Sequence, residues 1–333
     1  MLQWSIEPVR LELRYTWKIS RNATDEKTNL IVTLADGSVE GQGEAAPNVR
    51  YGESPERLQE EFLRFVSATG PEQRTPEAYV RIARASGCSN ALRFAIESAA
   101  WHFAGGNRRE ELYRALSLDA PGSVPTSYTI PIIDPGQLRA FYDREQLGRF
   151  RYLKLKIDRE SAYDSIAELC TFTKAPVMVD ANEAFTDVEE LIRLLEKIRR
   201  LPIEFVEQAL PDRLREESLY LKKYCPFPHF ADEAVTDEPD MAFISAAYHG
   251  VNMKLMKAGG YSNGLRILRE AKRLGLRTMI GCMVETSLGI GSALNLCSLA
   301  DYADLDSFLI LKKEPYGLIR EEDGLLSFSR TEH

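Results

Sequence analysis

The first third of the chain changes from strand-like alternation to helical periodicity. Apolar and polar residues alternate over 6–16 and 29–34, and the tetrapeptide ADGS that follows favours a hairpin turn. Over residues 55–105 the apolar positions recur at helical spacing, and Ser54 stands where a helix N-cap is expected. These patterns predict an α+β domain over residues 1–120.

From about residue 121 short apolar segments alternate regularly with amphipathic helices. Eight such segments can be counted, from VPTSYTI to ADLDSFLIL. One intervening helix has a capping box of Thr186 and Glu189, and another ends at Gly275. Parallel strands need helical crossovers, and eight such units over about 190 residues suit a closed barrel. We predict an α/β fold in which residues 121–316 form a (β/α)8-type TIM barrel.

Composition and charge narrow the function classes. Of the 333 residues, 44% are apolar and 28% are charged, which is enough apolar surface for a large core. The formal net charge of −8 supplies no positive field for nucleic acid or an anionic membrane. The five cysteines and four histidines form no CxxC, HxH or HExxH motif, which argues against zinc hydrolysis. The chain shows no export segment and no long apolar run, so we expect a cytoplasmic protein.

The most informative feature is the charge at the ends of the predicted strands. Five successive apolar segments each end in a charged residue, and consecutive ones are separated by 24 to 27 positions. These residues are Lys156, Asp180, Glu207, Asp232 and Lys257. Each separation corresponds to one strand and one helix. Because the carboxyl ends of barrel strands meet at one mouth, we expect the five side chains to lie together.

The three carboxylates of this set indicate a metal. At one mouth they would repel one another unless a cation neutralised them. Oxygen ligands without His or Cys favour a hard divalent ion, so Asp180, Glu207 and Asp232 predict a site for Mg²⁺, with Mn²⁺ as the second choice. The ion would keep coordination positions open for water and for a substrate carboxylate, and would act as an electrophile.

The two lysines of the set come from the second and sixth strands, on opposite sides of the barrel. We prefer Lys257 to Lys254 because strand alternation puts the two on opposite faces, and the AGG after Lys257 is typical of the mouth. An ammonium near a cation and another ammonium has a lowered pKa, so one lysine can act as base while the other acts as acid. Lys156 and Lys257 would then remove and return a proton on opposite faces of one carbon, which is a 1,1-proton transfer.

The order of the motifs KLK, VDAN, VEQ, ADE and KLMKAGG resembles the enolase superfamily, in its muconate-lactonizing-enzyme subgroup. The segments GQGEAAP and IESAAWHF are similar to that subgroup's capping domain, and ETSLGIGSALNLC to its seventh-strand region. The resemblance covers nearly the whole chain. It implies a modified (β/α)7β barrel whose α+β N-terminal cap is completed by the C-terminal tail, residues 317–333. It also implies a metal at Asp180, Glu207 and Asp232, with catalytic Lys156 opposite Lys257.

The segment ADLDSF resembles the dipeptide epimerases of this subgroup. Asp304 and Asp306 are two residues apart, so on a strand end they point to the same side. In those enzymes such a pair receives the α-ammonium of the first residue, and an Arg in an early cap loop pairs a glutamate side chain. Arg21 is the candidate for that Arg, and Arg50 is a second candidate anion contact. Lys154 is a further substrate-binding candidate, with a structural or field-shaping role as the alternative.

Our leading hypothesis is a Mg²⁺-dependent dipeptide epimerase that inverts the α-carbon of the C-terminal residue. The resemblance implies a substrate such as the murein peptide L-Ala-D/L-Glu or another dipeptide. Other subgroup reactions stay open, namely those of an o-succinylbenzoate synthase, an N-succinylamino acid racemase or a cycloisomerase. A metal-free Schiff-base lyase and a dipeptide-binding protein without turnover are further alternatives. Assembly into a homo-oligomer is left open.

Overall fold

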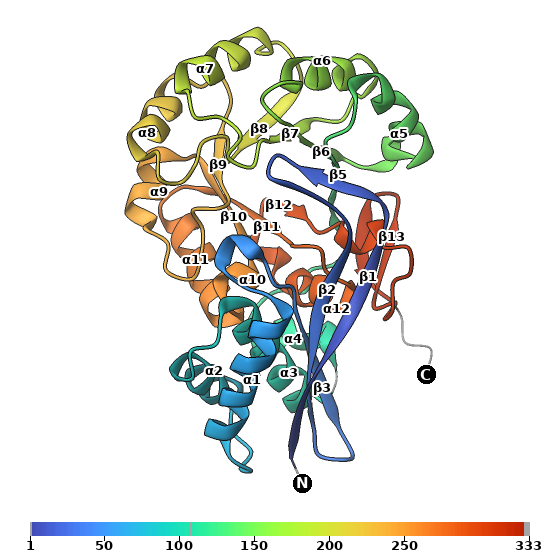
Figure 1. Ribbon diagram of the computed structural model, residues 1–333, viewed down its shortest axis with the longest axis vertical. Helices are drawn as coiled ribbons and strands as arrows, with labels where there is room; N and C mark the ends of the chain where they lie inside the picture. The colour runs from blue at the N-terminus through green and yellow to red at the C-terminus, as the bar shows by residue number, and fades with distance from the viewer. Residues whose placement is uncertain (1, 107, 330–333) are drawn as a thin grey trace.

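The computed structural model describes residues 2–106 and 108–329. Within this part of the chain, eight parallel strands form the ring in the upper half of Figure 1. They follow one another in chain order: β5 (Ser127–Ile130), β6 (Tyr152–Lys156), β7 (Val177–Asp180), β8 (Ile203–Glu207), β9 (His229–Ala231), β10 (Gly250–Lys254), β11 (Arg277–Gly281) and β12 (Tyr302–Asp304). A parallel bridge between Thr126 and Ala303 joins the first segment to the last. The predicted barrel is confirmed.

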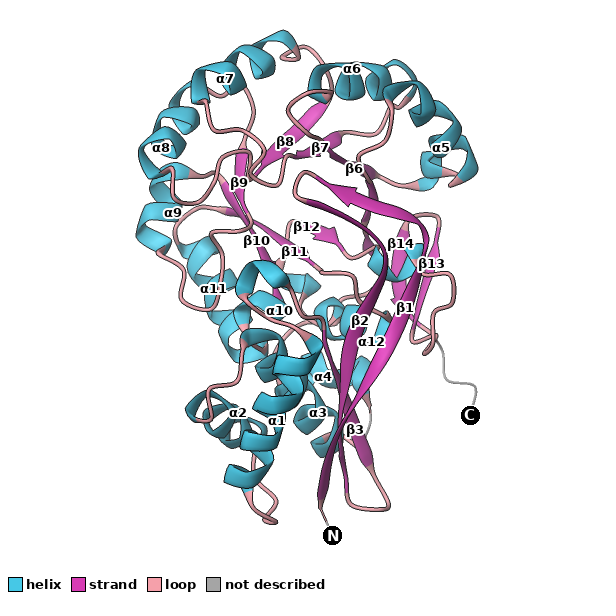
Figure 2. Ribbon diagram, viewed as in Figure 1, coloured by secondary structure: helices cyan, strands magenta, loops and turns pink. Residues whose placement is uncertain are grey.

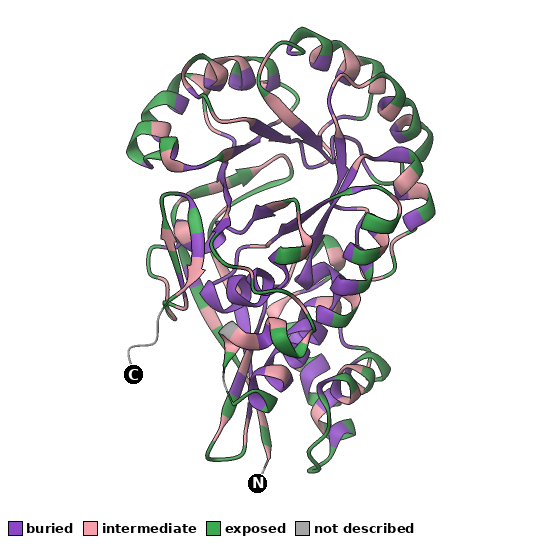
Figure 3. Ribbon diagram, turned by 180° about the vertical axis from the view of Figure 1, so that it is seen from behind, coloured by how far each residue is buried: buried purple, intermediate pink, exposed green. Residues whose placement is uncertain are grey.

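Helices cover the outside of the ring (Figure 2). They are α5 (Leu138–Arg144), α6 (Ala162–Phe172), α7 (Val188–Lys197), α8 (Arg215–Tyr224), α9 (Met241–Ala247), α11 (Tyr261–Arg273) and α12 (Ser287–Leu294). Each turns apolar residues inward, as Leu191 and Leu195 of α7 do, and Figure 3 shows the burial concentrated along the strands. The predicted end at Gly275 is confirmed, since Gly275 follows the C-cap residue Leu274 of α11 and has a φ of +74°. The predicted capping box is wrong by one residue, because Asp187 and not Thr186 accepts the first-turn amides of α7.

The N-terminal region forms a cap over the barrel. Its antiparallel sheet consists of β1 (Gln3–Ile19), β2 (Asn22–Ala35) and β3 (Glu40–Ala45), followed by α1 (Pro55–Thr69), α2 (Pro76–Ala85), α3 (Asn90–Ala104) and the short α4 (Leu112–Ala115). Ser54 caps α1 as predicted. The glycines of the GQGEAA segment let α3 approach β3 closely, because a Cβ on Gly41 would lie 2.2 Å from the carbonyl oxygen of Ala99. The hairpin of β1 and β2 reaches across the mouth of the barrel (Figure 1).

Two buried carboxylates of the cap fasten it to the barrel. Glu44 of β3 accepts hydrogen bonds from the backbone amides of Thr286 and Gly289 at the start of α12. Glu97 of α3 accepts one from the amide of Tyr261 at the start of α11, at 2.6 Å. A carboxylate at a helix N-terminus satisfies amides that the helix leaves unpaired. The cap therefore has a fixed orientation over the mouth.

The sixth barrel strand is shorter than the sequence indicated, and the tail forms two strands of its own. The sixth strand ends at Lys254, and the following residues form the short helix α10 (Leu255–Ala258). In the tail, β13 (Ile319–Glu322) pairs with β14 (Leu325–Phe328), and β14 pairs in turn with β4 (Val124–Pro125). The end of the predicted tail, residues 330–333, lies outside the described residues, and the domain boundaries stay a prediction. Among the described residues, no helix is long and apolar enough to cross a membrane.

Candidate active site

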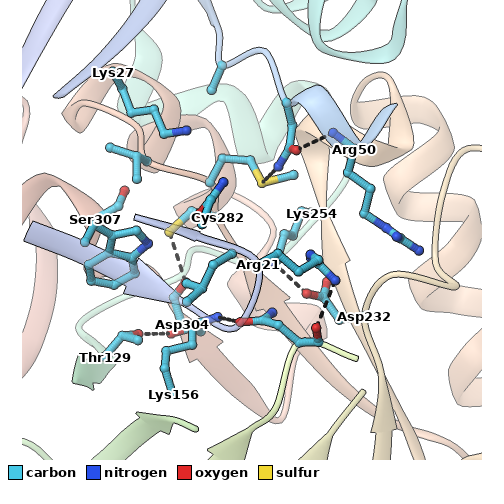
Figure 4. Close-up of a pocket in the computed structure, with 18 of the residues that line it drawn as sticks. Arg21, Lys27, Arg50, Thr129, Lys156, Asp232, Lys254, Cys282, Asp304 and Ser307 are labelled. Carbon is cyan, nitrogen blue, oxygen red and sulfur yellow. Dashed lines mark hydrogen bonds and ion pairs between the residues drawn. The ribbon is translucent and has the colours of Figure 1, made fainter. Parts of the chain in front are cut away.

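A cavity of about 440 Å³ lies between the barrel mouth and the cap (Figure 4). The barrel contributes residues at the ends of β5, β6, β9, β10 and β12 and the loop after β11. The cap contributes the tip of the β1–β2 hairpin and residues 46–51, which include the 3-10 helix η1 (Val49–Tyr51). The cavity is therefore bounded by strand ends on one side and by cap segments on the other.

The last residue of β6 is Lys156, which lines this cavity as predicted for a reacting group. Its ammonium lies 2.6 Å from a carboxylate oxygen of Asp180 and 2.9 Å from Oδ1 of Asn182. The side chain is buried, so these contacts fix where its nitrogen stands. Lys156 is thus held at the floor of the cavity.

On the opposite side of the barrel, the structure brings Lys254 and not Lys257 to the cavity. Lys254 ends β10, lines the cavity and lies 2.9 Å from Oδ2 of Asp232. Lys257 lies on α10, 2% exposed, and its ammonium bonds the backbone carbonyl and Oδ1 of Asp232. Among the described residues that line the cavity, Lys257 does not occur. The prediction of Lys257 is therefore corrected, because the strand ends three residues earlier than the spacing indicated.

Lys156 and Lys254 face each other across the mouth. In the ring of eight strands, β6 and β10 are four positions apart, which is the largest possible separation. Burial lowers the pKa of Lys254, but the combined attraction of Asp232, Glu207 and Glu233 outweighs burial, and the net pKa is raised. The expected lowering of a lysine pKa is therefore not seen at Lys254 while Asp232 is its partner. Burial lowers the pKa of Lys257.

The three predicted metal ligands stand at the ends of neighbouring strands. Asp180 and Glu207 end β7 and β8, and Asp232 follows β9 directly. All three are buried, and the ammonium of Lys154 lies 3.0 Å from Asp180 and 2.9 Å from Glu207. Lys154 is thus the counter-ion of two of the three carboxylates. Burial lowers the pKa of Lys154, but the carboxylates outweigh this and raise it well above its usual value.

The donor set has the chemistry that a hard divalent ion requires. It offers only carboxylate oxygens, and Oε2 of Glu207 is buried with the ammonium of Lys154 as its ion-pair partner at 2.9 Å. Across the ranges 2–106 and 108–329, no three His, Cys, Asp or Glu side chains converge closely enough to hold a metal. Lys154 stands beside Asp180 and Glu207, and Asp232 is bound by two lysines. The ligand atoms are of the type that a hard divalent ion prefers. Metal binding by this chain stays a prediction.

The two aspartates of the ADLDSF segment are brought together at the mouth. Asp304 accepts from Ser127 Oγ at 2.8 Å and is also paired with Lys154 at the same distance. Asp306 accepts from the backbone amide of Thr129. Burial and the charge of Asp304 raise the pKa of Asp306 to about 7. Both residues line the cavity, so a cationic group of a ligand could reach them.

The cap arginines are engaged with the barrel. Arg21 lies in the turn between β1 and β2, and its guanidinium is 2.6 Å from Glu183 and 2.7 Å from Glu233. Arg50 of η1 is 2.8 Å from the other oxygen of Glu183. Arg21 lines the cavity, as the predicted substrate contact requires, but its charge is already paired. Glu183, which sequence reasoning missed, holds both cap segments to the β7–α7 loop.

Two further residues at the cavity were not foreseen. Asn182 positions the ammonium of Lys156, and its place two residues after Asp180 in VDAN was the available signal. Lys27 lines the cavity from β2. The alternation of side chains along β2 could have identified Lys27, because it puts Lys27 on the same face as the buried Asn29.

Comparison with known proteins defines the class of this molecule. Residues 137–321 match the family described as enolase C-terminal domain-like. An L-Ala-D/L-amino acid epimerase from Pedosphaera parvula is 35% identical over 98% of this chain and 96% of its own length. The chain therefore belongs to the enolase superfamily, among its dipeptide epimerases. It is an isomerase of the racemase and epimerase type.

Solved structures agree with this assignment. An enolase-family protein from Agrobacterium tumefaciens with homology to dipeptide epimerases, bound to sodium and L-Ala-L-Glu, aligns with a TM-score of 0.89 at 26% identity, covering 99% of this chain and 98% of that one. A dipeptide epimerase from Methylococcus capsulatus, in complex with Mg and L-Arg-D-Lys, aligns with a TM-score of 0.85 at 27% identity, covering 98% and 96%. These neighbours bind different dipeptides, so the fold alone does not define the substrate.

Proposed function

We propose that this protein is a Mg²⁺-dependent dipeptide epimerase that inverts the α-carbon of the C-terminal residue by 1,1-proton transfer. The observation that carries the proposal is the placement of Lys156 and Lys254 at opposite sides of one cavity, beside three buried carboxylates. Two amines on opposite faces of a carbon are what a stereochemical inversion needs. Lys254 takes the role first predicted for Lys257.

One lysine removes a proton from the substrate, and the other lysine supplies a proton in its place. The neutral lysine removes the α-proton from its face of the carbon, and the ammonium of the other lysine returns a proton to the opposite face. The roles reverse for the other epimer. Asp180, Glu207 and Asp232 would hold the Mg²⁺, whose positive charge stabilises the negative charge that develops on the substrate carboxylate. Asn182 keeps the nitrogen of Lys156 in place, and Asp232 does the same for Lys254.

Asp304 and Asp306 are proposed to bind the free α-ammonium of the dipeptide. Buried carboxylates are stabilised by an opposite charge, and a muconate or succinylbenzoate substrate offers none. The ammonium would also keep Asp306 ionised, since the pKa of this group is raised to about 7 in its absence. This pair therefore favours a dipeptide over the anionic substrates of related reactions.

The remaining details of the proposal follow the same reasoning. Mn²⁺ is expected to replace Mg²⁺, because both prefer oxygen ligands. Murein peptides such as L-Ala-D/L-Glu are proposed as one source of substrate, in line with the L-Ala-L-Glu bound by the Agrobacterium protein. A cytoplasmic location is proposed because all five cysteines are free thiols.

The function is tested by proton exchange. The protein is incubated with Mg²⁺ in D₂O against a library of L,L and L,D dipeptides, and NMR follows deuterium at the C-terminal α-carbon. We expect incorporation together with inversion, loss of both with EDTA, and recovery with Mg²⁺ or Mn²⁺. Calorimetric binding of a dipeptide without any exchange would instead indicate a binding protein, and exchange of N-succinylamino acids alone would indicate the racemase alternative.

A further inference from the structure

One cationic side chain at the cavity has no partner among the described residues. Lys27 on β2 lines the cavity and is half-buried, and it makes no ion pair or side-chain hydrogen bond with any residue in the described ranges. The other cationic side chains on the described cavity wall are each paired with a carboxylate. These are Arg21, Arg50, Lys154, Lys156 and Lys254. Lys27 thus differs from them in offering an uncompensated positive charge to a ligand.

Lys27 lies at the end of the cavity that holds the two aspartates. It shares a face of β2 with Asn29, whose amide nitrogen donates to the carbonyl of Val284 at 2.8 Å. That face is therefore turned to the loop after β11. The same loop is tied to the segment after Asp306 by a 3.0 Å hydrogen bond from the amide of Glu285 to Ser307. Figure 4 shows Lys27 on the side of Ser307 and Cys282, away from Arg50 and Asp232.

The orientation of a bound dipeptide follows from the proposed function. Its α-ammonium meets Asp304 and Asp306, and its C-terminal α-carbon lies between Lys156 and Lys254. The side chain of the N-terminal residue then branches from the atom next to that ammonium, at the end of the cavity where Lys27 stands. The C-terminal side chain branches at the other end. Lys27 therefore faces the first side chain of the substrate.

We propose that Lys27 binds the side-chain carboxylate of an acidic N-terminal residue, so that the enzyme favours dipeptides that begin with Asp or Glu. This inference rests on the proposed function, because that function sets the orientation of the substrate. An acidic first residue would pair with all the charged groups at this end of the cavity. Its α-ammonium would bind Asp304 and Asp306, and its side-chain carboxylate would bind Lys27. Burial lowers the pKa of Lys27, in keeping with a charge that is partly shielded from water and gains from an anionic partner.

The test compares isosteric substrates. Epimerisation of L-Glu-L-Ala and L-Gln-L-Ala is measured for the wild type and for Lys27→Met. We expect kcat/KM of the wild type to favour the Glu substrate by at least about tenfold, chiefly through KM, and the preference to disappear in Lys27→Met. Lys27→Glu should reverse it and favour L-Lys-L-Ala. Lys18→Met is the matched control, because Lys18 is an exposed lysine of the same hairpin outside the set that lines the cavity.

The outcomes separate this inference from the proposed function. If the Glu preference is absent, or is equal in the wild type and in Lys27→Met, the role of Lys27 is wrong although epimerisation stands. If Lys27→Met changes only the ratio of L-Ala-L-Glu to L-Ala-L-Gln, the residue faces the second side chain and the inference is also wrong. If no dipeptide is turned over, the proposed function fails, and calorimetry with L-Glu-L-Ala and L-Gln-L-Ala still decides whether Lys27 selects the carboxylate. Circular dichroism and thermal unfolding confirm that each variant is folded.

Discussion

The barrel mouth and the cap face each other across one cavity, but their charged residues are placed in different ways. At the mouth, Asp180, Glu207 and Lys254 each end a strand, so the strand–helix repeat sets their position. On the cap, Arg21 and Arg50 lie in short turns, and both bind Glu183, which is 162 and 133 residues away in the chain. The strand–helix repeat thus sets the position of the reacting groups, whereas tertiary contacts set the surroundings of the substrate side chains.

Two lysines that are three residues apart, Lys254 at the cavity and Lys257 behind it, should respond very differently to substitution. Lys254→Met should lower kcat for epimerisation by about 10³-fold, because it removes a general acid–base group. Lys257→Met should act mainly on stability and lower the free energy of unfolding by about 3 kcal/mol. The reason is that the buried carboxylate of Asp232 loses the ammonium of Lys257 as an ion-pair partner. Steady-state kinetics and urea unfolding of both variants provide the measurement. A fully active Lys254→Met enzyme would contradict the proposal that Lys254, and not Lys257, is the second acid–base residue.

The next effect concerns the end of the cavity that receives the ammonium. Asp306→Asn should reduce kcat/KM for dipeptides by about 10²-fold, because a charge-assisted hydrogen bond to the substrate is lost. The control is Asp301→Asn, since Asp301 lies outside the cavity lining and accepts hydrogen bonds from Thr278. An enzyme for an anionic substrate would not lose turnover in Asp306→Asn, so unchanged kinetics would favour the alternative subgroup reactions.

The sequence predicted the mouth better than the cap for a physical reason. Asp180 and Glu207 were placed correctly at strand ends because the chain must return to the mouth once in each strand–helix unit. Lys257 was misplaced because Leu255–Ala258 forms a helical turn that ends at Gly259, which has a φ of +74°. The spacing of about 25 residues between charged positions does not show that a strand stops a few residues early. The pairing of Arg21 with Glu183 depends on how the cap packs on the barrel, and no local pattern encodes it.

A smaller effect tests how the cap segments are held. Glu183→Gln should raise KM by about three- to tenfold with little change in kcat, because Arg21 and Arg50 lose their common carboxylate and residues around the cavity become less well positioned. Glu190→Gln is the matched control, since Glu190 pairs with Arg159 at the surface. Equal KM values in the two variants would show that Glu183 does not organise the cap.

The smallest effect is a dependence of stability on pH near the junction of cap and barrel. Burial and the charge of Glu44 raise the pKa of Glu285 from 4.5 to about 8. The folded state therefore keeps a proton that the unfolded chain has released, so this contribution to stability is complete below pH 4.5 and is lost as the pH rises through 8. The free energy of unfolding should fall by about 1 kcal/mol between pH 7.5 and 9, and less in Glu285→Gln. The free energies are measured by urea unfolding at several pH values. An equal fall with pH in the wild type and in Glu285→Gln would contradict this prediction.

Single-lysine variants in D₂O show whether Lys156 and Lys254 act from opposite faces of one carbon. With only one lysine left, the α-proton of the epimer that faces it should exchange for deuterium without inversion. Lys254→Met should therefore exchange one of the L,L and L,D epimers, and Lys156→Met should exchange only the other. If both variants label the same epimer, the two amines share one face of the carbon, and Lys156 and Lys254 cannot invert it by the proposed 1,1-proton transfer.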